Sequence, residues 1–158
     1  MILFVVITGS LSAQGPRGKD LGFGLVLGEP TGLTLKYWLN KENALNFDLG
    51  NSFFGATRID IDYLWHFDAF SSKIIKMTAG FGGVFGIGRG NDWWYHDRHG
   101  WYYRDGGNFG FGVRGLIGLN IIPKKAPIEL FLNLGVLVGI HPDFGSGFEG
   151  SAGIRFYP

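Results

Sequence analysis

The chain contains no cysteine among its 158 residues. Disulfide bonds, thiolate nucleophiles, metal sites built from cysteine and a lipid-modified cysteine are therefore excluded. It also lacks any uninterrupted run of about 18 apolar residues, which a membrane-spanning helix would need. If this chain enters a bilayer, it must do so as a closed barrel, because only a barrel can then pair every backbone polar group.

The chain also has little excess charge. Its 14 Lys and Arg against 13 Asp and Glu give a net charge of +1, so we expect no nucleic-acid partner. Two GxGxxG matches begin at Gly110 and Gly145, but neither opens a helix after a strand, and no cofactor is predicted. The length suits one domain.

Glycine and aromatic residues are abundant instead, at 28 glycines and 16% aromatics, a composition that favours tightly curved sheet. The first residues join an apolar run, 2–7, to small residues ending at Ala13. This order predicts a signal peptide at 1–13 and a mature domain at 14–158. The alternative is a buried first strand, which the Gly-Ser and Gly-Pro pairs around it disfavour.

From Asp20 onward, apolar residues recur at every second position, which is typical of strands. On one face of these segments every side chain is uncharged, as in the series Ile128, Leu130, Leu132 and Leu134. The eight segments lie at about 20–27, 31–39, 44–52, 58–67, 73–87, 107–121, 127–140 and 147–156.

The opposite face carries many glycines together with five positive and five negative side chains. A soluble, lipocalin-like barrel would point its apolar face inward, but an eight-stranded barrel has too little room for a bulky side chain at nearly every inward position. A lipid-facing Arg or Lys costs roughly 2–4 kcal/mol at the bilayer midplane, which explains the uncharged face. The predicted lumen ions are Lys36, Asp48, Arg58, Asp60, Asp62, Lys76, Arg114, Glu129, Glu149 and Arg155.

These observations predict an all-β, eight-stranded antiparallel up-and-down transmembrane β-barrel in the bacterial outer membrane. Such barrels have short periplasmic turns and longer outer loops. With both termini in the periplasm, the connections at 40–43, 68–72 and 122–126 face the periplasm and are short. The longest connection, 88–106, then faces outward.

Several stretches resemble a family of small outer-membrane β-barrel proteins of unassigned function, built on the OmpA/OmpX-type eight-stranded plan. They are LGFGLVLGEPTGLTLKYWL (21–39), IDIDYLWHF (59–67), GVRGLIGLNII (112–122), APIELFLNLGVLVGIHP (126–142) and SAGIRFYP (151–158). The connection 88–106 is longer and more aromatic than the resemblance implies. The chain also ends in Tyr157-Pro158, where such barrels close on an aromatic residue that assembly machinery is thought to recognise.

The inward charges are most simply an ion-pair network that fills the lumen, since enclosed unpaired charges are costly; the rival interpretation is a narrow pore. His66 shares the inward face with Asp60 and Asp62, and we expect a hydrogen-bonded lumen histidine, because no nucleophile is placed to complete a triad.

The connection 88–106 is rich in aromatic residues and arginine, a composition typical of binding surfaces. The alternative is an extended hairpin whose lower aromatics lie at the membrane interface. His96 and His99 with nearby aspartates are too weak a pattern to predict a metal site. The predicted ligand-binding residues are Trp93, Trp94, Tyr95, Arg98, Trp101, Tyr102 and Tyr103.

We therefore expect a monomeric, non-enzymatic barrel with a structural role and adhesion-like binding through its outer loop. Its expected partners are outer-membrane lipid, the barrel assembly machinery and a host or extracellular ligand. A lipid-modifying enzyme of the small-barrel type is the alternative, but it needs a Ser/His/acid set at the outer rim, where the histidines lack an adjacent serine.

Overall fold

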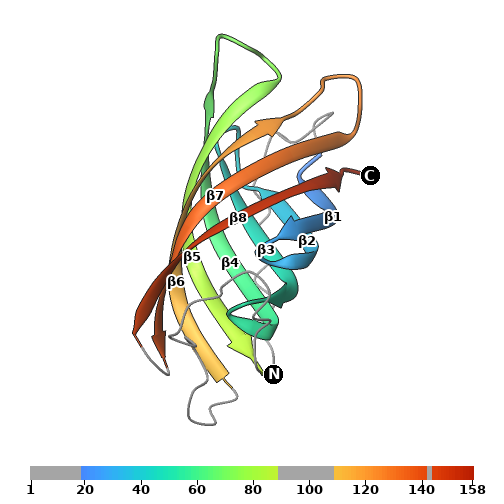
Figure 1. Ribbon diagram of the computed structural model, residues 1–158. Coiled ribbons are helices and arrows are strands. Elements are labelled where there is room, and N and C mark those ends of the chain that lie inside the picture. Colours follow the sequence, from blue (N-terminus) through green and yellow to red (C-terminus); the bar gives the residue numbers. More distant parts are fainter. Residues whose placement is uncertain (1–18, 89–108, 142–143) are drawn as a thin grey trace, which may run out of the picture.

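The computed structural model describes residues 19–88, 109–141 and 144–158. Each strand pairs antiparallel with the next, and β8 returns to β1, which closes the barrel (Figure 1). This confirms the predicted all-β, eight-stranded antiparallel up-and-down barrel. The strands are β1 (Leu21–Gly28), β2 (Thr31–Trp38), β3 (Asn43–Ser52), β4 (Gly55–Asp68), β5 (Ile75–Ile87), β6 (Phe109–Ile121), β7 (Ile128–His141) and β8 (Gly145–Phe156). Within the described residues, no helix is long and apolar enough to cross a membrane.

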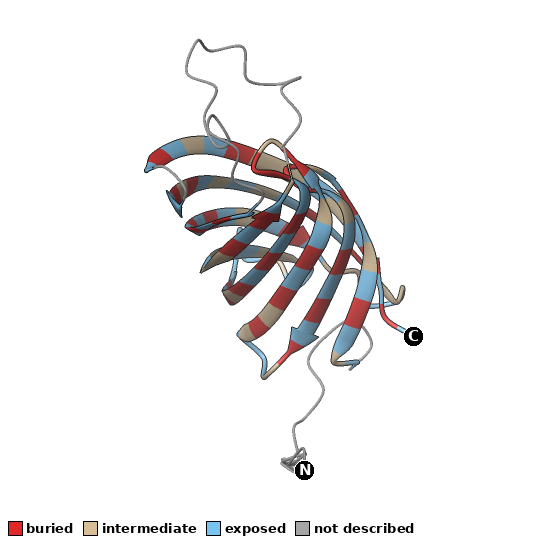
Figure 2. Cartoon of the chain, turned by 90° about the horizontal axis from the view of Figure 1, so that it is seen from below, coloured by how far each residue is buried: buried red, intermediate tan, exposed pale blue. Residues whose placement is uncertain are grey.

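Burial alternates along every strand, as the colours in Figure 2 show. On β7 the outward Leu132 is 52% exposed, whereas its inward neighbour Phe131 is 5% exposed. None of the uncharged outward positions predicted from the sequence is buried. The predicted sidedness is therefore confirmed, with bulky hydrocarbon outside and the ionic side chains inside.

The inner face is more varied than the glycines and ions that the sequence analysis emphasised. At one end of the lumen, Trp38, Leu64, Leu116 and Tyr157 form an apolar cluster with Ala44. At the other end, Phe54, Val84 and Leu137 form a second one. The polar middle of the lumen thus lies between two apolar clusters.

Glycines make room for the large lumen side chains. The ring of Tyr157 lies over Gly22, where an added Cβ would stand 2.5 Å from the ring. Gly82 gives similar space to the Asp62 carboxylate. These two inward glycines leave space for side chains from other parts of the barrel, so they serve packing rather than flexibility.

The two ends of the barrel differ in their connections. We call the end where β8 finishes the C-terminal end; it carries the connections 39–42, 69–74 and 122–127, of four to six residues (Figure 1). At the opposite end, the connections 29–30, 53–54 and 142–144 have only two or three residues. At this end, only the connection 88–108 is longer than the connections at the C-terminal end. It alone therefore fits the predicted contrast between short periplasmic turns and longer outer loops.

Residues 73 and 74, predicted as strand, belong instead to the 69–74 turn. Phe70 and Ser71 adopt left-handed conformations with φ of 53° and 52°. The Ser72 hydroxyl then accepts hydrogen bonds from the backbone N–H groups of Ile74 and Ile75, at 3.2 and 3.3 Å. Such local side-chain bonds compete with strand pairing, so β5 begins at Ile75.

Candidate functional site

The structure brings nine of the ten predicted lumen ions together inside the barrel. Lys76 does not join them, because it lies one residue into β5, at the rim, where its ammonium contacts the exposed Asp68 carboxylate at 3.0 Å. The nine buried residues are Lys36, Asp48, Arg58, Asp60, Asp62, Arg114, Glu129, Glu149 and Arg155.

Arg114, on β6, is the centre of the first group of contacts. Its guanidinium binds the Asp62 carboxylate with two hydrogen bonds, Nε to Oδ1 at 2.8 Å and Nη2 to Oδ2 at 2.5 Å. It also lies 3.1 Å from Asp48, 2.6 Å from Asp60 and 3.2 Å from Glu149. A guanidinium offers five donors in a planar fork, so one arginine can serve four carboxylates from three strands.

Arg58 extends this group toward the opposite end of the barrel. It lies 2.7 Å from Asp60 and 2.8 Å from Glu149, and it donates a 3.1 Å bond to the Ser52 hydroxyl. Its guanidinium is also 4.0 Å from the carboxylate of Glu29. Arg58 and Arg114 thus share Asp60 and Glu149 between them.

Glu29 also belongs to this group, although it was not among the predicted lumen ions. It lies in the connection 29–30, where strand alternation gives no information about direction, yet it is buried. Its backbone N–H donates to the carbonyl of Gly150 at 2.9 Å, and its carboxylate accepts from the N–H of Phe53 at 3.2 Å. Burial raises the pKa of the Glu29 carboxyl above its ordinary value.

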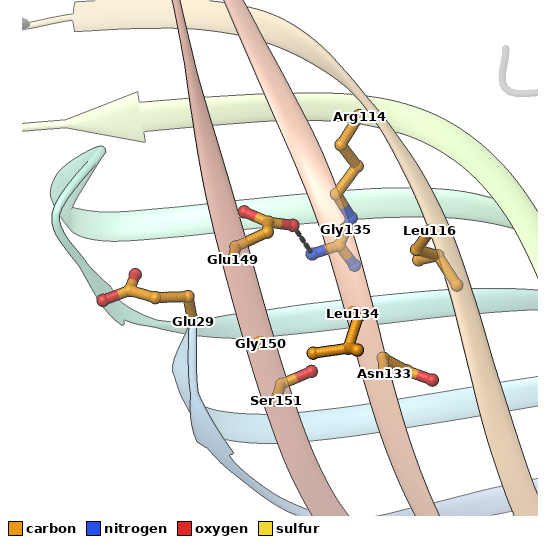
Figure 3. A pocket seen from close by; sticks show the side chains of 9 residues that line it. All are labelled: Glu29, Arg114, Leu116, Asn133, Leu134, Gly135, Glu149, Gly150 and Ser151. Atoms are coloured by element: carbon orange, nitrogen blue, oxygen red, sulfur yellow. Dashed lines mark hydrogen bonds and ion pairs between the residues drawn. The ribbon is translucent and has the colours of Figure 1, made fainter.

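A small cavity of about 10 Å³ lies beside these residues. Figure 3 shows Glu149 and the Arg114 guanidinium joined across it, with Glu29 at one side. Leu116 and Leu134 also line it, together with Asn133 and Ser151. The volume suits about one water molecule, which makes it too small for an organic substrate.

Glu129, on β7, is the centre of a second group, nearer the C-terminal end. Its Oε1 lies 2.8 Å from the Lys36 ammonium and 3.0 Å from the Arg155 guanidinium. The same oxygen accepts a 2.5 Å bond from the Asn120 amide, and Oε2 accepts from the Tyr157 hydroxyl. One carboxylate is therefore surrounded by four donors.

His66 completes this second group. Its Nε2 lies 2.7 Å from the Lys36 ammonium, and its Nδ1 lies 3.1 Å from the carbonyl of Glu42. Since an ammonium can only donate, Nε2 accepts and Nδ1 carries the proton. The ring also packs 4.3 Å from that of Trp38. This agrees with the expected hydrogen-bonded lumen histidine.

Asn46 joins the two groups into one network. Its amide nitrogen donates to Asp48 at 2.9 Å and to Asp62 at 3.1 Å, while its oxygen accepts from Arg155 at 2.7 Å. Arg155 also donates to the Thr34 hydroxyl at 2.9 Å. Neither Asn46 nor Thr34 was among the predicted lumen residues, although both occupy the inward face by alternation. Polar contacts therefore run without a break from Glu29 to Tyr157.

This arrangement fills the middle of the lumen with paired side chains. Opposite charges and hydrogen bonds meet throughout its middle, and the two apolar clusters lie at its ends. Among the described residues, no group of three or more His, Asp or Glu is placed to hold a metal ion. The charged side chains inside thus compensate one another.

The predicted ligand-binding residues of the outer loop, from Trp93 to Tyr103, lie outside the described residues. So does the predicted signal peptide at 1–13. The described part of the barrel places only the strand ends from which the loop departs, Ile87 and Phe109, which pair with each other.

The comparisons with known proteins give a likeness in structure. No protein-family model matches the chain, and no curated protein matches it significantly. The chain resembles the crystal structure of the N-terminal β-barrel domain of Pseudomonas aeruginosa OprF, with a TM-score of 0.61 and 13% sequence identity. The match covers 90% of this chain and 98% of that one. The likeness shows that the two share their fold, the small eight-stranded barrel that the sequence resemblance implied.

Proposed function

We propose that the chain is a non-enzymatic outer-membrane β-barrel that acts as a structural scaffold and presents its connection 88–106 to an extracellular ligand. One observation carries the membrane assignment. Among the described residues, no strand exposes a charged side chain on the outer face between its ends, while leucine, isoleucine and phenylalanine are exposed all around it. A surface in water rarely exposes so large an apolar area.

Strand length supports the same assignment. A tilted membrane-spanning strand needs about 9–11 residues. The strands β3 to β8 have 10 to 14 residues, whereas β1 and β2 have 8. The apolar band is therefore tall enough on most of the circumference, and it is lowest over β1 and β2.

The paired charges that fill the lumen support a structural rather than a catalytic or conducting role. The charged side chains inside bind one another, and the small cavity suits about one water molecule. A pore of useful conductance would need a continuous aqueous path. We expect no conductance from the purified protein in planar bilayers, and stable single-channel currents would support the narrow-pore alternative instead.

The membrane assignment is tested by folding the full chain from urea into phosphatidylcholine vesicles. Folding is followed by heat-modifiable migration in detergent gels. The variant Leu134→Arg changes an outward residue of β7 that is 59% exposed. In lipid it should cost roughly 2–4 kcal/mol of unfolding free energy, whereas at a water-exposed site the effect stays within about 0.5 kcal/mol.

Leu134→Met is the matched control, because it retains an apolar side chain of similar size. It should unfold at nearly the same urea concentration as the parent protein. Equal stability of the arginine variant and this control would contradict the membrane assignment. Export is tested separately, by the mass of the protein recovered from cells, which should lack residues 1–13.

The binding role is tested by applying whole cells that carry the protein to glycan and protein arrays. Deletion of 91–104 removes Trp93, Trp94, Tyr95, Arg98, Trp101, Tyr102 and Tyr103, and we expect loss of binding on glycan and protein arrays with heat-modifiable folding retained. Replacing the six aromatic residues by serine while keeping loop length is the matched control for shortening, and it should abolish binding as well. Binding that persists in both variants would remove the loop from the proposal.

A further inference from the structure

The charged side chains of the described residues occupy only two places. Ten are buried inside the barrel, and every other one lies at the C-terminal end. Six of those at the C-terminal end are lysines, which we call the lysine collar, and three are acidic. The collar consists of Lys19, Lys41, Lys73, Lys76, Lys124 and Lys125, and the acidic residues are Asp20, Glu42 and Asp68.

The choice of cation also differs between the two places. Three of the four buried cations are arginines, whereas the collar has no arginine among the described residues. Arginine suits buried, bidentate contacts with carboxylates. Lysine carries a compact charge on a flexible apolar stem, and such side chains extend along an apolar surface to reach a polar boundary.

The collar adjoins exposed apolar side chains. Phe70, in the 69–74 turn, is 79% exposed, and Ile74 follows Lys73 directly and is 40% exposed. The N–H of Ile122 donates to the carbonyl of Ile74 at 2.7 Å, which joins this turn to the connection that carries Lys124. Apolar and cationic side chains thus meet where the outer apolar band ends. Figure 1 shows the connections 69–74 and 122–127 at its upper edge.

We propose that the lysine collar binds the phosphates of anionic phospholipid headgroups, while Phe70 and Ile74 enter the adjoining acyl region. The lysines come from the segment before β1 and from the connections 39–42, 69–74 and 122–127, with Lys76 at the start of β5, so they surround the barrel. Headgroups also surround a barrel, whereas a protein partner would contact one side. In the predicted orientation this end faces the periplasmic leaflet.

This inference rests on the proposed membrane location of the outer face. The test uses the full chain, folded into phosphatidylcholine vesicles that contain either spin-labelled phosphatidylglycerol or spin-labelled phosphatidylcholine. The relative association of the two labelled lipids with the barrel is read from their immobilised fractions. The parent protein should prefer phosphatidylglycerol by about fivefold, the effect of roughly one lysine near an anionic surface, and salt should weaken this preference.

The variant with Lys41, Lys73, Lys124 and Lys125 all replaced by Gln should lose the preference, and the matched variant with Arg at the same four positions should keep it. Equal association of the two lipids with the parent protein, or a preference that survives the Gln replacements, would overturn the lysine collar as a headgroup site. Failure of the parent protein to fold into any vesicle would overturn the membrane location as well, so the two failures are distinguishable.

Discussion

The lumen contains two centres of opposite charge that are built alike. Arg114 is a buried cation in contact with four carboxylates, and Glu129 is a buried carboxylate in contact with four donors. Both lie on strands from the long-stranded side of the barrel, β6 and β7. Each one gathers side chains from strands that are far apart in sequence, and so each one links opposite walls of the barrel.

The surroundings of the two centres differ in how they can respond to a change. The neighbours of Arg114 are carboxylates, which can be neutralised by taking up protons. The charged neighbours of Glu129 are Lys36 and Arg155, and a guanidinium does not lose its proton at any pH that proteins tolerate. The comparison therefore predicts that low pH will relieve the loss of Arg114 but not the loss of Glu129.

Replacing Arg114 by Met should have the largest effect. The variant keeps the volume but leaves Asp48 and Asp62 without a cation, while Asp60 and Glu149 retain Arg58. Removing one partner from such a buried network typically costs about 3–5 kcal/mol. Urea unfolding from lipid vesicles at pH 7.5 measures this loss. As the pH falls toward 5, the stranded carboxylates take up protons and their repulsion ends, so the deficit should narrow.

Arg114→Lys is the control for this prediction, because it keeps the charge but cannot make the two parallel bonds to Asp62. It should be less destabilised than the Met variant, and its deficit should depend less on pH. If the stability lost in the Met variant stays constant or increases as the pH falls, the predicted difference between the Arg114 and Glu129 centres is wrong.

Replacing Glu129 by Gln should have the next largest effect, about 2–3 kcal/mol. The amide keeps one acceptor oxygen, but Lys36 and Arg155 lose their counter-charge. Both cations keep their protons in acid, so the deficit should not narrow between pH 7.5 and 5. Unfolding measured in the same vesicles tests this, and a recovery at low pH equal to that of the Arg114 variant would remove the distinction between the two centres.

Replacing Tyr157 by Phe should cost about 1 kcal/mol. The change removes the hydroxyl that donates to Glu129 and that accepts a 3.1 Å bond from Trp38 Nε1, but it keeps the ring over Gly22. The temperature at which the folded band disappears in detergent gels should fall slightly. The corresponding temperature for Tyr157→Ala, which also loses the ring, should fall much further. A Phe variant whose folded band disappears at the same temperature as that of the parent protein would deny the hydroxyl a role.

Replacing Glu29 by Gln should have the smallest effect and the opposite sign. Burial raises the pKa of Glu29, so its ionised form costs stability at neutral pH, and this cost disappears as the pH falls below the ordinary carboxyl value. The Gln variant should therefore be slightly more stable than the parent at pH 7.5 and equal to it near pH 4. Unfolding curves at the two pH values measure this, and a variant that is less stable at pH 7.5 would contradict it.

The sequence predicted the barrel and its sidedness because strand alternation fixes which face each residue occupies. It failed where alternation stops. Glu29 lies in a connection and turns inward through backbone contacts that only the closed barrel supplies. Lys76 has the inward phase but lies at the rim, because the left-handed turn at Phe70 and Ser71 delays the start of β5.

The pairing of charges was also beyond the sequence. Alternation placed Arg114 and Asp48 on the same face but gave no hint that they would be partners, because contacts across the lumen depend on how the register accumulates around the barrel. Tyr157 is a related case. Phe156, the last residue of β8, points outward, and Tyr157, directly after the strand, points inward. The predicted strand ended at 156, so Tyr157 was not assigned to the inward face.

The most direct test of sidedness is spin labelling at single introduced cysteines, because the chain has no cysteine of its own. Single cysteines are placed at 130 to 137 on β7 and spin-labelled, and the collision rates of each label with oxygen and with a water-soluble nickel complex are measured in vesicles. Oxygen contact should be high at Leu130, Leu132, Leu134 and Val136 and low at the positions between them. The opposite phase, or strong nickel contact at the outward positions, would contradict a lipid-facing apolar surface.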